Sequence, residues 1–384
     1  MADGDMALLG IGVGLTVVAA SQVALMSGLR RISELAWLNV GGAALACAIG
    51  IGVLIELGGR GVVLFVVATP LSGALLGSIF VMRARRGQTR VAAAPMFAMV
   101  RGMAGAGIAF MLSSVALLAS QIFIRGIVQA DLGARALGYF QAAWAVSMTY
   151  IGFVLAAMST DYFPRLTRSI NDVDATIATV NEQAEFSLLV AAPIVLVMIG
   201  TAPYLMRILY SAAFVQAAGI FQWQVLGDVL KIASWPVGYV LLAAGRGRSF
   251  LLSETTAMFV LCGFTWIAMP YIGLEAAGIS FVVMYAAYLP LVLWLARRHI
   301  PIKLTRAIWV NGAILFVAVG LLMIISRNSP LFGAILSVIA SLAAGAIAVQ
   351  RIGVAASWRP SLARFAARIG RIADRSREGD NNAG

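Results

Sequence analysis

The chain has 384 residues, of which 61% are apolar and 11% are charged, and its formal net charge is +12. Soluble domains average roughly 45–50% apolar and about 25% charged residues, so this composition excludes an ordinary soluble fold and indicates a polytopic membrane protein. The two cysteines, Cys47 and Cys262, lie within apolar runs and predict neither a disulfide framework nor a reactive thiol.

Eleven apolar segments are long enough to cross a bilayer as helices, which takes about 20 residues each. Their connections are short, and no connection offers room for a separate catalytic domain. We therefore expect an all-α membrane protein with about eleven transmembrane helices. The predicted segments are 6–29, 33–56, 61–82, 99–124, 136–160, 186–209, 217–244, 249–270, 274–296, 306–326 and 330–350.

Basic residues are distributed unevenly between the two sides of this arrangement. Of the 28 lysines and arginines, 22 lie on one side, five lie on the other, and Lys231 alone falls within a span. The side richer in Lys and Arg is the cytoplasmic side of most membrane proteins. We therefore expect a periplasmic N-terminus and a cytoplasmic C-terminus.

The longest connection, 161–185, and the tail, 351–384, both carry amphipathic patterns. In the connection, apolar residues recur every three or four positions from Leu166 to Val180, which predicts a separate helix at the membrane interface. In the tail, an apolar stripe lies beside a stripe of arginines. That pattern predicts a surface helix bound to anionic lipid, since a nucleic-acid-binding arm would have no use for the apolar stripe.

An internal repeat relates the stretch that begins at Gly28 to the stretch that begins at Ala243. Each has a helix end with glycine and two basic residues, a span, a tight glycine turn and a return helix rich in small residues, and parallel repeats of this kind are typical of transporters. Three helices precede the second copy and none precedes the first, so we expect a fourteen-helix protein that lacks its first three helices. The corresponding division is a partial lobe of three helices (1–98), a complete six-helix lobe (99–300), two additional helices (301–350) and a basic cytoplasmic tail (351–384).

The predicted span 217–244 carries Asp228 and Lys231 three residues apart near its middle. At that spacing the two side chains share a helix face. A spanning helix keeps ionisable groups in hydrocarbon only when they are paired or line a polar cavity. Two interpretations stay open: a structural ion pair that fixes helix packing, or two side chains that line a cavity.

Three stretches resemble the O-antigen translocase group of oligosaccharide flippases, within the multidrug, oligosaccharidyl-lipid and polysaccharide exporter superfamily. They are LGYFQAAWAVSMTYIGFVLAAMSTDYFPRLTR (Leu137–Arg168), FQWQVLGDVLKIASWPVGYVLLAAGRGRSF (Phe221–Phe250) and GLEAAGISFVVMYAAYLPL (Gly273–Leu291). The resemblance covers essentially the whole chain. It implies two six-helix lobes around a central cavity, often with two additional C-terminal helices, in the bacterial inner membrane.

The resemblance also implies a function. Proteins of this kind pass an undecaprenyl-pyrophosphate-linked oligosaccharide from the cytoplasmic to the periplasmic leaflet by alternating access, without a cofactor and with polysaccharide-assembly proteins as partners. With its first lobe incomplete, the chain is either such a flippase or an inactive remnant of one.

A flippase breaks no covalent bond and needs a polar cavity for the sugar and the pyrophosphate. Lys231 would bind the pyrophosphate, with Asp228 orienting it or taking a coupling proton, and Trp235 and Tyr239 would stack on sugar rings. The other candidates are Gln121 and Arg125 at the outer end of a helix, Glu254 in an unusually polar run, Asp161 as a gate at the inner mouth, and Pro236 as a kink. Each also has a structural interpretation as packing, interfacial anchoring, capping or a linker start.

Two other classes of function stay open. One is an integral-membrane enzyme of polysaccharide assembly, which would be expected to carry a large periplasmic loop with paired charged residues, and no outer connection here is long enough. The other is a drug or metabolite exporter of the same superfamily. Enzyme signals are weak, because the chain has one histidine, His299, and no metal-spaced cluster or nucleophile constellation.

Overall fold

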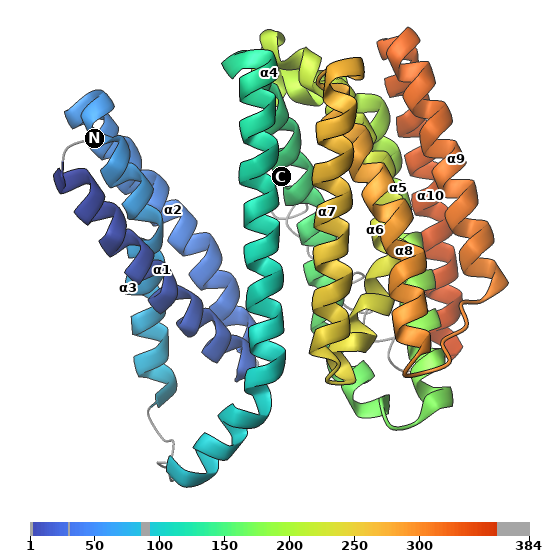
Figure 1. Cartoon of the computed structure of the whole chain (residues 1–384), viewed down its shortest axis with the longest axis horizontal. Helices are drawn as coiled ribbons and strands as arrows, with labels where there is room; N and C mark the ends of the chain where they lie inside the picture. Colours follow the sequence, from blue (N-terminus) through green and yellow to red (C-terminus); the bar gives the residue numbers. More distant parts are fainter. Residues whose placement is uncertain (1–2, 30, 86–92, 359–384) are drawn as a thin grey trace, which may run out of the picture. The chain divides into compact units, whose positions relative to one another are not determined.

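The structure, a computed structural model, describes residues 3–29, 31–85 and 93–358, and these residues are almost entirely helical (Figure 1). Ten helices of the described chain are long and apolar enough to cross a membrane. The chain divides into two compact units, Met1–Phe97 (unit 1) and Ala98–Gly384 (unit 2). The prediction of an all-α polytopic membrane protein is therefore confirmed.

Unit 1 contains three helices, α1 (Asp3–Gly28), α2 (Ile32–Leu57) and α3 (Val62–Arg85). Both α1 and α2 pack on α3. The amide of Gln22 on α1 donates to the Ser78 hydroxyl on α3 at 2.9 Å, which pairs two polar groups between the helices.

Helix α4 (Ala93–Ser169) crosses the boundary between the units, and all but its first five residues belong to unit 2. This 77-residue stretch contains two of the predicted spans. Its backbone breaks at Gly133, where φ is 81° and ψ is 175°. Contacts show that the chain folds back there: Phe110 stacks on Phe250 near one end of the unit, and Tyr139 packs on Phe214 at the other. Tyr162, further along α4, contacts Tyr239 near the first end again. One helical stretch therefore supplies two antiparallel spans, which accounts for ten long helices where eleven segments were predicted.

The two ends of unit 2 are distinguished by the glycine turns at Gly133 and Gly245. The Gly133 end holds the fold in α4 and the connection between α5 and α6, and the Gly245 end holds the connection between α6 and α7, at the bottom of unit 2 in Figure 1.

The connection 161–185 differs from the prediction. Residues up to Ser169 complete α4, and α5 (Val173–Leu209) starts almost at once, with the Asp172 carboxylate capping it by accepting from the Ala175 N–H at 3.0 Å. The predicted apolar stripe is present on these helices, but it faces protein, since Leu166 and Val180 are fully buried. The predicted interfacial helix is wrong, because its apolar face packs on neighbouring helices and α5 runs without a break into its span.

Helix α6 (Ala217–Ala243) is followed by the remaining helices of unit 2. They are α7 (Gly247–Ile272), α8 (Glu275–Arg297), α9 (Arg306–Asn328) and α10 (Pro330–Trp358). Helix α6 packs on α5, α8 and α9, and most of its span is buried inside the protein. Other helices keep large apolar side chains on the outside, such as Phe259 and Ile208, as expected of surfaces that face lipid. The central position of α6 explains how it can hold polar groups away from lipid.

Polar contacts hold α9 against the rest of unit 2 at both ends. At the Gly133 end, the Arg327 guanidinium contacts the Glu275 carboxylate at 3.1 Å and donates to the Gln222 amide oxygen at 3.1 Å. At the Gly245 end, the buried Asn181 amide group donates to the Lys303 carbonyl at 2.9 Å and accepts from the Thr305 N–H at 2.8 Å. These contacts join α9 to α5, α6 and α8.

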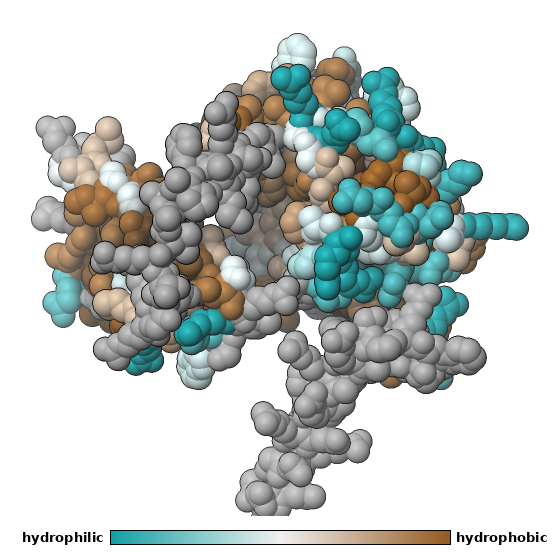
Figure 2. Space-filling model, turned by 90° about the horizontal axis from the view of Figure 1, so that it is seen from below, coloured by the Kyte–Doolittle hydropathy of each residue, from teal (hydrophilic) through white to brown (hydrophobic). Residues whose placement is uncertain are grey.

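Hydrophilic side chains gather over the Gly245 end of unit 2, as the view from below in Figure 2 shows. His299 is exposed there, 3.3 Å from the Ser249 hydroxyl. Partial desolvation, together with the nearby Arg246 and Arg298, lowers the pKa of this imidazole. Of the predicted amphipathic tail, 351–384, the first eight residues complete α10, and 359–384 lies outside the described residues.

Candidate functional site

A partly open cavity of about 270 Å³ lies within unit 2, between both halves of α4 and helices α6, α7 and α8. Its walls are mainly aromatic rings, methionines and leucines, with one lysine, one glutamate and two serines. The lining residues are Phe110, Ser113, Ser114, Leu117, Trp144, Met148, Lys231, Phe250, Glu254, Met258, Leu261, Phe281, Met284 and Tyr285. The cavity brings together Lys231 and Glu254, two of the residues that the sequence singled out.

Lys231 reaches this cavity from the middle of α6. Its ammonium lies 5.7 Å from the ring centroid of Phe281 and 5.8 Å from that of Tyr285, and it donates to the Met148 sulfur at 3.9 Å. Aromatic faces stabilise a cation only partly, by roughly 0.5–2 kcal/mol each. A lysine held in this way can still bind an anion that enters the cavity.

Glu254 lines the cavity from α7. The buried Tyr288 hydroxyl on α8 donates to one carboxyl oxygen of Glu254 at 2.7 Å. Among the described residues, no ion pair within 4.0 Å joins Glu254 to Lys231. The cavity therefore offers an ammonium and a carboxyl group that are not paired with each other.

Asp228 lies one turn from Lys231 on α6 but belongs to a different cluster. One of its carboxyl oxygens accepts from the Tyr150 hydroxyl and from the Ser147 hydroxyl at 3.3 Å, both on the second half of α4. The carboxyl group is fully buried, and its other oxygen has no hydrogen-bond partner in the part of the chain that the structure describes. Within the described chain, Asp228 and Lys231 do not form an ion pair within 4.0 Å, so the contacts do not support a direct structural pair.

Gln224 extends this buried polar cluster and was missed by the sequence interpretation. It lies one turn before Asp228 on α6 and is fully buried. No described residue forms a hydrogen bond with its amide oxygen or nitrogen. The spacing of four residues could have indicated a shared face. Nothing in the sequence could have indicated Tyr150 or Ser147, which are 78 and 81 positions away from Asp228.

The structure places five other candidates outside the lining of the cavity. Trp235 and Tyr239 pack on each other, with ring centroids 4.5 Å apart, and both rings also contact Tyr162. The Tyr162 hydroxyl donates to the Pro236 carbonyl at 2.7 Å. Gln121 accepts from Arg125, one turn along α4, at 3.5 Å.

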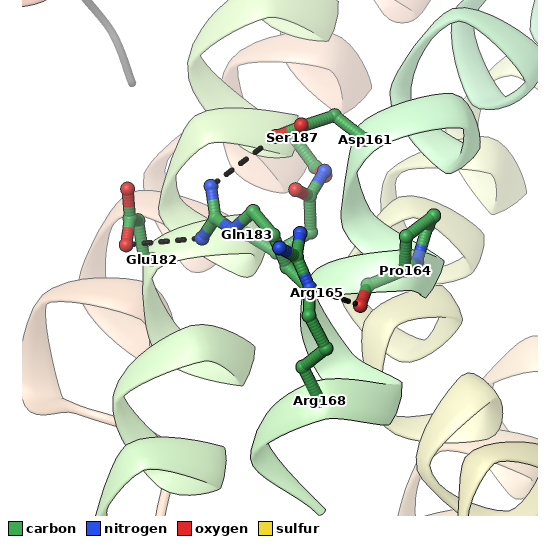
Figure 3. A network of polar contacts seen from close by, with 7 residues as sticks. All are labelled: Asp161, Pro164, Arg165, Arg168, Glu182, Gln183 and Ser187. Atoms are coloured by element: carbon green, nitrogen blue, oxygen red, sulfur yellow. Dashed lines mark hydrogen bonds and ion pairs between the residues drawn. The ribbon is translucent and has the colours of Figure 1, made fainter. Parts of the chain in front are cut away.

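Asp161 lies at the Gly245 end, where α4 meets α5. Arg165 contacts the Asp161 carboxylate at 3.4 Å and the Glu182 carboxylate at 3.1 Å, so that one arginine bridges the two helices (Figure 3). The Asp161 side chain is 77% exposed, which makes its contact with Arg165 a weak surface pair.

The chain belongs to a family of membrane proteins that serve polysaccharide biosynthesis. Residues 5–219, more than half of the chain, match the model of the family described as "Polysaccharide biosynthesis protein". Two curated relatives are the "Lipid III flippase" proteins of Escherichia coli (strain K12) and Shigella flexneri. Each is 26% identical to this chain over 181 residues, which is 47% of this chain and 43% of the relative. The matched part thus spans less than half the length of these relatives.

Solved structures show that the fold is shared with known transporters. The "Lipid II flippase MurJ, inward closed conformation" matches with a TM-score of 0.64 and 9% sequence identity, over 90% of this chain and 74% of that chain. The structure titled "Crystal structure of MATE in the bent conformation" matches with a TM-score of 0.60 and 16% identity, over 80% of this chain and 69% of that chain. The protein therefore has the fold of the superfamily that the sequence resembles.

Proposed function

We propose that the protein is a transporter that moves a lipid-linked oligosaccharide across the membrane. The observation that carries this proposal is the cavity in unit 2, where a single lysine faces space among aromatic and methionine side chains. A lipid-linked substrate has an anionic diphosphate and an apolar chain, and this lining can accommodate both kinds of group. The names of the curated relatives, which are lipid flippases, support the same class of substrate.

In the proposed mechanism Lys231 binds the diphosphate, and the apolar walls exclude water around it. Asp228 is the coupling or gating group. Its buried carboxyl group on α6 accepts a hydrogen bond from Tyr150 on α4, and it can change its partners when these helices move. Asp161 and Pro236 would act in gating at the Gly245 end. No covalent bond is formed or broken, so the protein is proposed to be a transporter and not an enzyme.

The finer parts of the proposal concern the substrate, the direction and the compartment. The substrate is an undecaprenyl-pyrophosphate-linked oligosaccharide of the O-antigen type, carried from the cytoplasmic to the periplasmic leaflet of the bacterial inner membrane. Polysaccharide-assembly proteins would be its partners, and anionic lipid would bind the tail. A drug or metabolite exporter would share the fold but would not select for a diphosphate.

A translocation assay tests the function directly. Purified protein in vesicles receives a fluorescent polyprenyl-diphosphate oligosaccharide, and a membrane-impermeant quencher reports which leaflet holds it. We expect translocation by the wild type, loss of translocation in Lys231→Met, and activity in Lys231→Arg, which keeps the charge. Arg207→Met, on an exposed arginine at the Gly133 end, is the matched control and should transport normally. Equal transport by Lys231→Met and the wild type would remove Lys231 from the mechanism.

A further inference from the structure

The size of the cavity limits which part of a lipid-linked oligosaccharide it can hold. At about 270 Å³ it lies just below the roughly 300–1,000 Å³ of sites for drug-sized ligands. A whole oligosaccharide on a polyprenyl diphosphate is far larger than such a ligand. Only one short portion of the substrate can therefore occupy the cavity at a time.

The charges of the lining indicate which portion this is. Lys231 can bind a phosphate oxygen, and it has no carboxylate within ion-pair distance among the described residues. Glu254 lines the same cavity from the neighbouring helix. A carboxylate repels a phosphate but accepts hydrogen bonds from hydroxyl groups. The pair suits a ligand that carries an anion at one end and hydroxyl groups next to it.

Tyr288 holds Glu254 in a fixed orientation for such a ligand. Its buried hydroxyl donates to one carboxyl oxygen at 2.7 Å, while a carboxylate can accept about four hydrogen bonds in all. Among the described residues, Tyr288 is the side chain that donates to Glu254. The remaining acceptor sites are thus available to the hydroxyl groups of a ligand.

Aromatic rings supply the walls that a sugar ring needs. Phe110 and Phe250 are stacked, with ring centroids 6.0 Å apart and an interplanar angle of 2°, and Phe281 meets Trp144 edge to face at 5.9 Å. All four line the cavity. The face of an aromatic ring carries partial negative charge, so it attracts the C–H groups of a sugar.

We infer that the cavity binds the junction between the diphosphate and the first sugar, with Glu254 as a residue that recognises sugar hydroxyl groups and Tyr288 as the residue that positions it. This inference rests on the proposed function and adds the part of the substrate that this cavity recognises. Glu254 then has a role distinct from that of Lys231, because Glu254 selects the sugar and Lys231 binds the phosphate.

Binding of soluble fragments separates these two roles. The full chain in lipid nanodiscs is titrated calorimetrically with inorganic pyrophosphate, with glucose 1-diphosphate and with its 2-acetamido analogue. We expect at least one sugar diphosphate to bind about tenfold more tightly than pyrophosphate, as one or two added hydrogen bonds would give. Glu254→Gln should remove most of that difference and leave pyrophosphate binding unchanged. Lys231→Met should weaken binding of all three ligands.

Two further variants separate recognition from general damage to the fold. Tyr288→Phe keeps the ring and loses the hydroxyl, so it should reduce the preference for the sugar diphosphate with unchanged pyrophosphate affinity. Asp174→Asn, on an exposed acid at the start of α5, should behave as the wild type. An equal effect of Glu254→Gln on all three ligands, or no effect on any, would overturn the inference.

The translocation assay distinguishes failure of this inference from failure of the proposed function. Vesicle transport of the polyprenyl-linked oligosaccharide without any binding of the soluble fragments would refute the junction site and leave the transporter intact. Binding of the sugar diphosphate with the predicted Glu254 dependence, but no transport, would keep the site and refute the proposed transport.

Discussion

At the scale of single residues, the most unusual feature is the fully buried carboxyl group of Asp228 in the central helix α6. Removing one hydrogen-bond partner of a buried polar group costs more than the bond itself contributes, because the group that remains is left unsatisfied. The second half of α4 supplies the two hydroxyl donors, Tyr150 and Ser147. The stability of unit 2 should therefore depend on those hydroxyl groups.

Tyr150→Phe tests this dependence. The substitution keeps the ring, which packs edge to face on Phe221 at 6.0 Å, and removes the hydroxyl that donates to Asp228. We expect a loss of about 1–3 kcal/mol in the free energy of unfolding, visible as a lower melting temperature of the purified protein. Tyr271→Phe is the control, since that tyrosine is 84% exposed on α7 and should tolerate the change. Equal melting temperatures for the two variants would contradict the prediction.

The sequence was informative about individual site residues but not about their partners. Charged residues within apolar runs singled out Lys231 and Glu254, because ionisable side chains are costly in hydrocarbon. The sequence could not show that the two line one cavity, nor that Asp228 hydrogen-bonds to α4 and not to Lys231. Such contacts depend on how helices rotate and pack, which a local pattern does not determine.

At the scale of helices, the fold-back in α4 depends on one residue. Gly133 has φ 81° and ψ 175°, a backbone region that is open essentially to glycine alone. A side chain at this position would be strained even though a Cβ atom would meet no other atom within 4 Å. The strain would come from the backbone itself.

Gly133→Ala should therefore destabilise unit 2 by about 1–3 kcal/mol. The matched control is Gly126→Ala in the same helix, where φ is not positive and no atom lies within 4 Å of the added Cβ. There alanine should be neutral or slightly stabilising, since glycine costs about 1 kcal/mol relative to alanine inside a helix. Melting temperatures of both variants check the expectation, and a loss of stability in Gly126→Ala as large as in Gly133→Ala would refute it.

The sequence predicted the positions of the spans correctly, but it did not predict the conformation of two connections between them. Apolar runs predict spans well because the bilayer requires about 20 apolar residues per helix. A connection was expected between the predicted spans 99–124 and 136–160, but a single glycine suffices to turn the chain, and Asp131 and Arg135 both lie within helix. In 161–185 the apolar stripe was predicted correctly, yet a stripe does not reveal whether it meets lipid or protein.

At the scale of the whole molecule, the direction of the proposed transport depends on which end of unit 2 faces the cytoplasm. The uneven distribution of basic residues predicts that the Gly245 end does. The structure gathers Arg246, Arg248 and Arg298 at that end, where Figure 2 shows many hydrophilic side chains.

Cysteine labelling tests this orientation. In a background with Cys47→Ala and Cys262→Ala, one variant carries Arg248→Cys at the Gly245 end and another carries Arg207→Cys at the Gly133 end. Both positions are exposed. A membrane-impermeant maleimide added to intact spheroplasts should label position 207 and should reach position 248 only after permeabilisation. The reverse pattern would invert the proposed topology and with it the direction of transport.

The two polar attachments of α9 have a practical consequence for studies of motion. Because Arg327 and Glu275 hold one end of this helix and Asn181 and Thr305 hold the other, α9 should move together with α5 and α8 as one body. Spectroscopic labels on the outer faces of α5 and α9 would then keep a constant separation during the transport cycle. That separation is an internal standard against which every other interhelical distance in the protein can be calibrated.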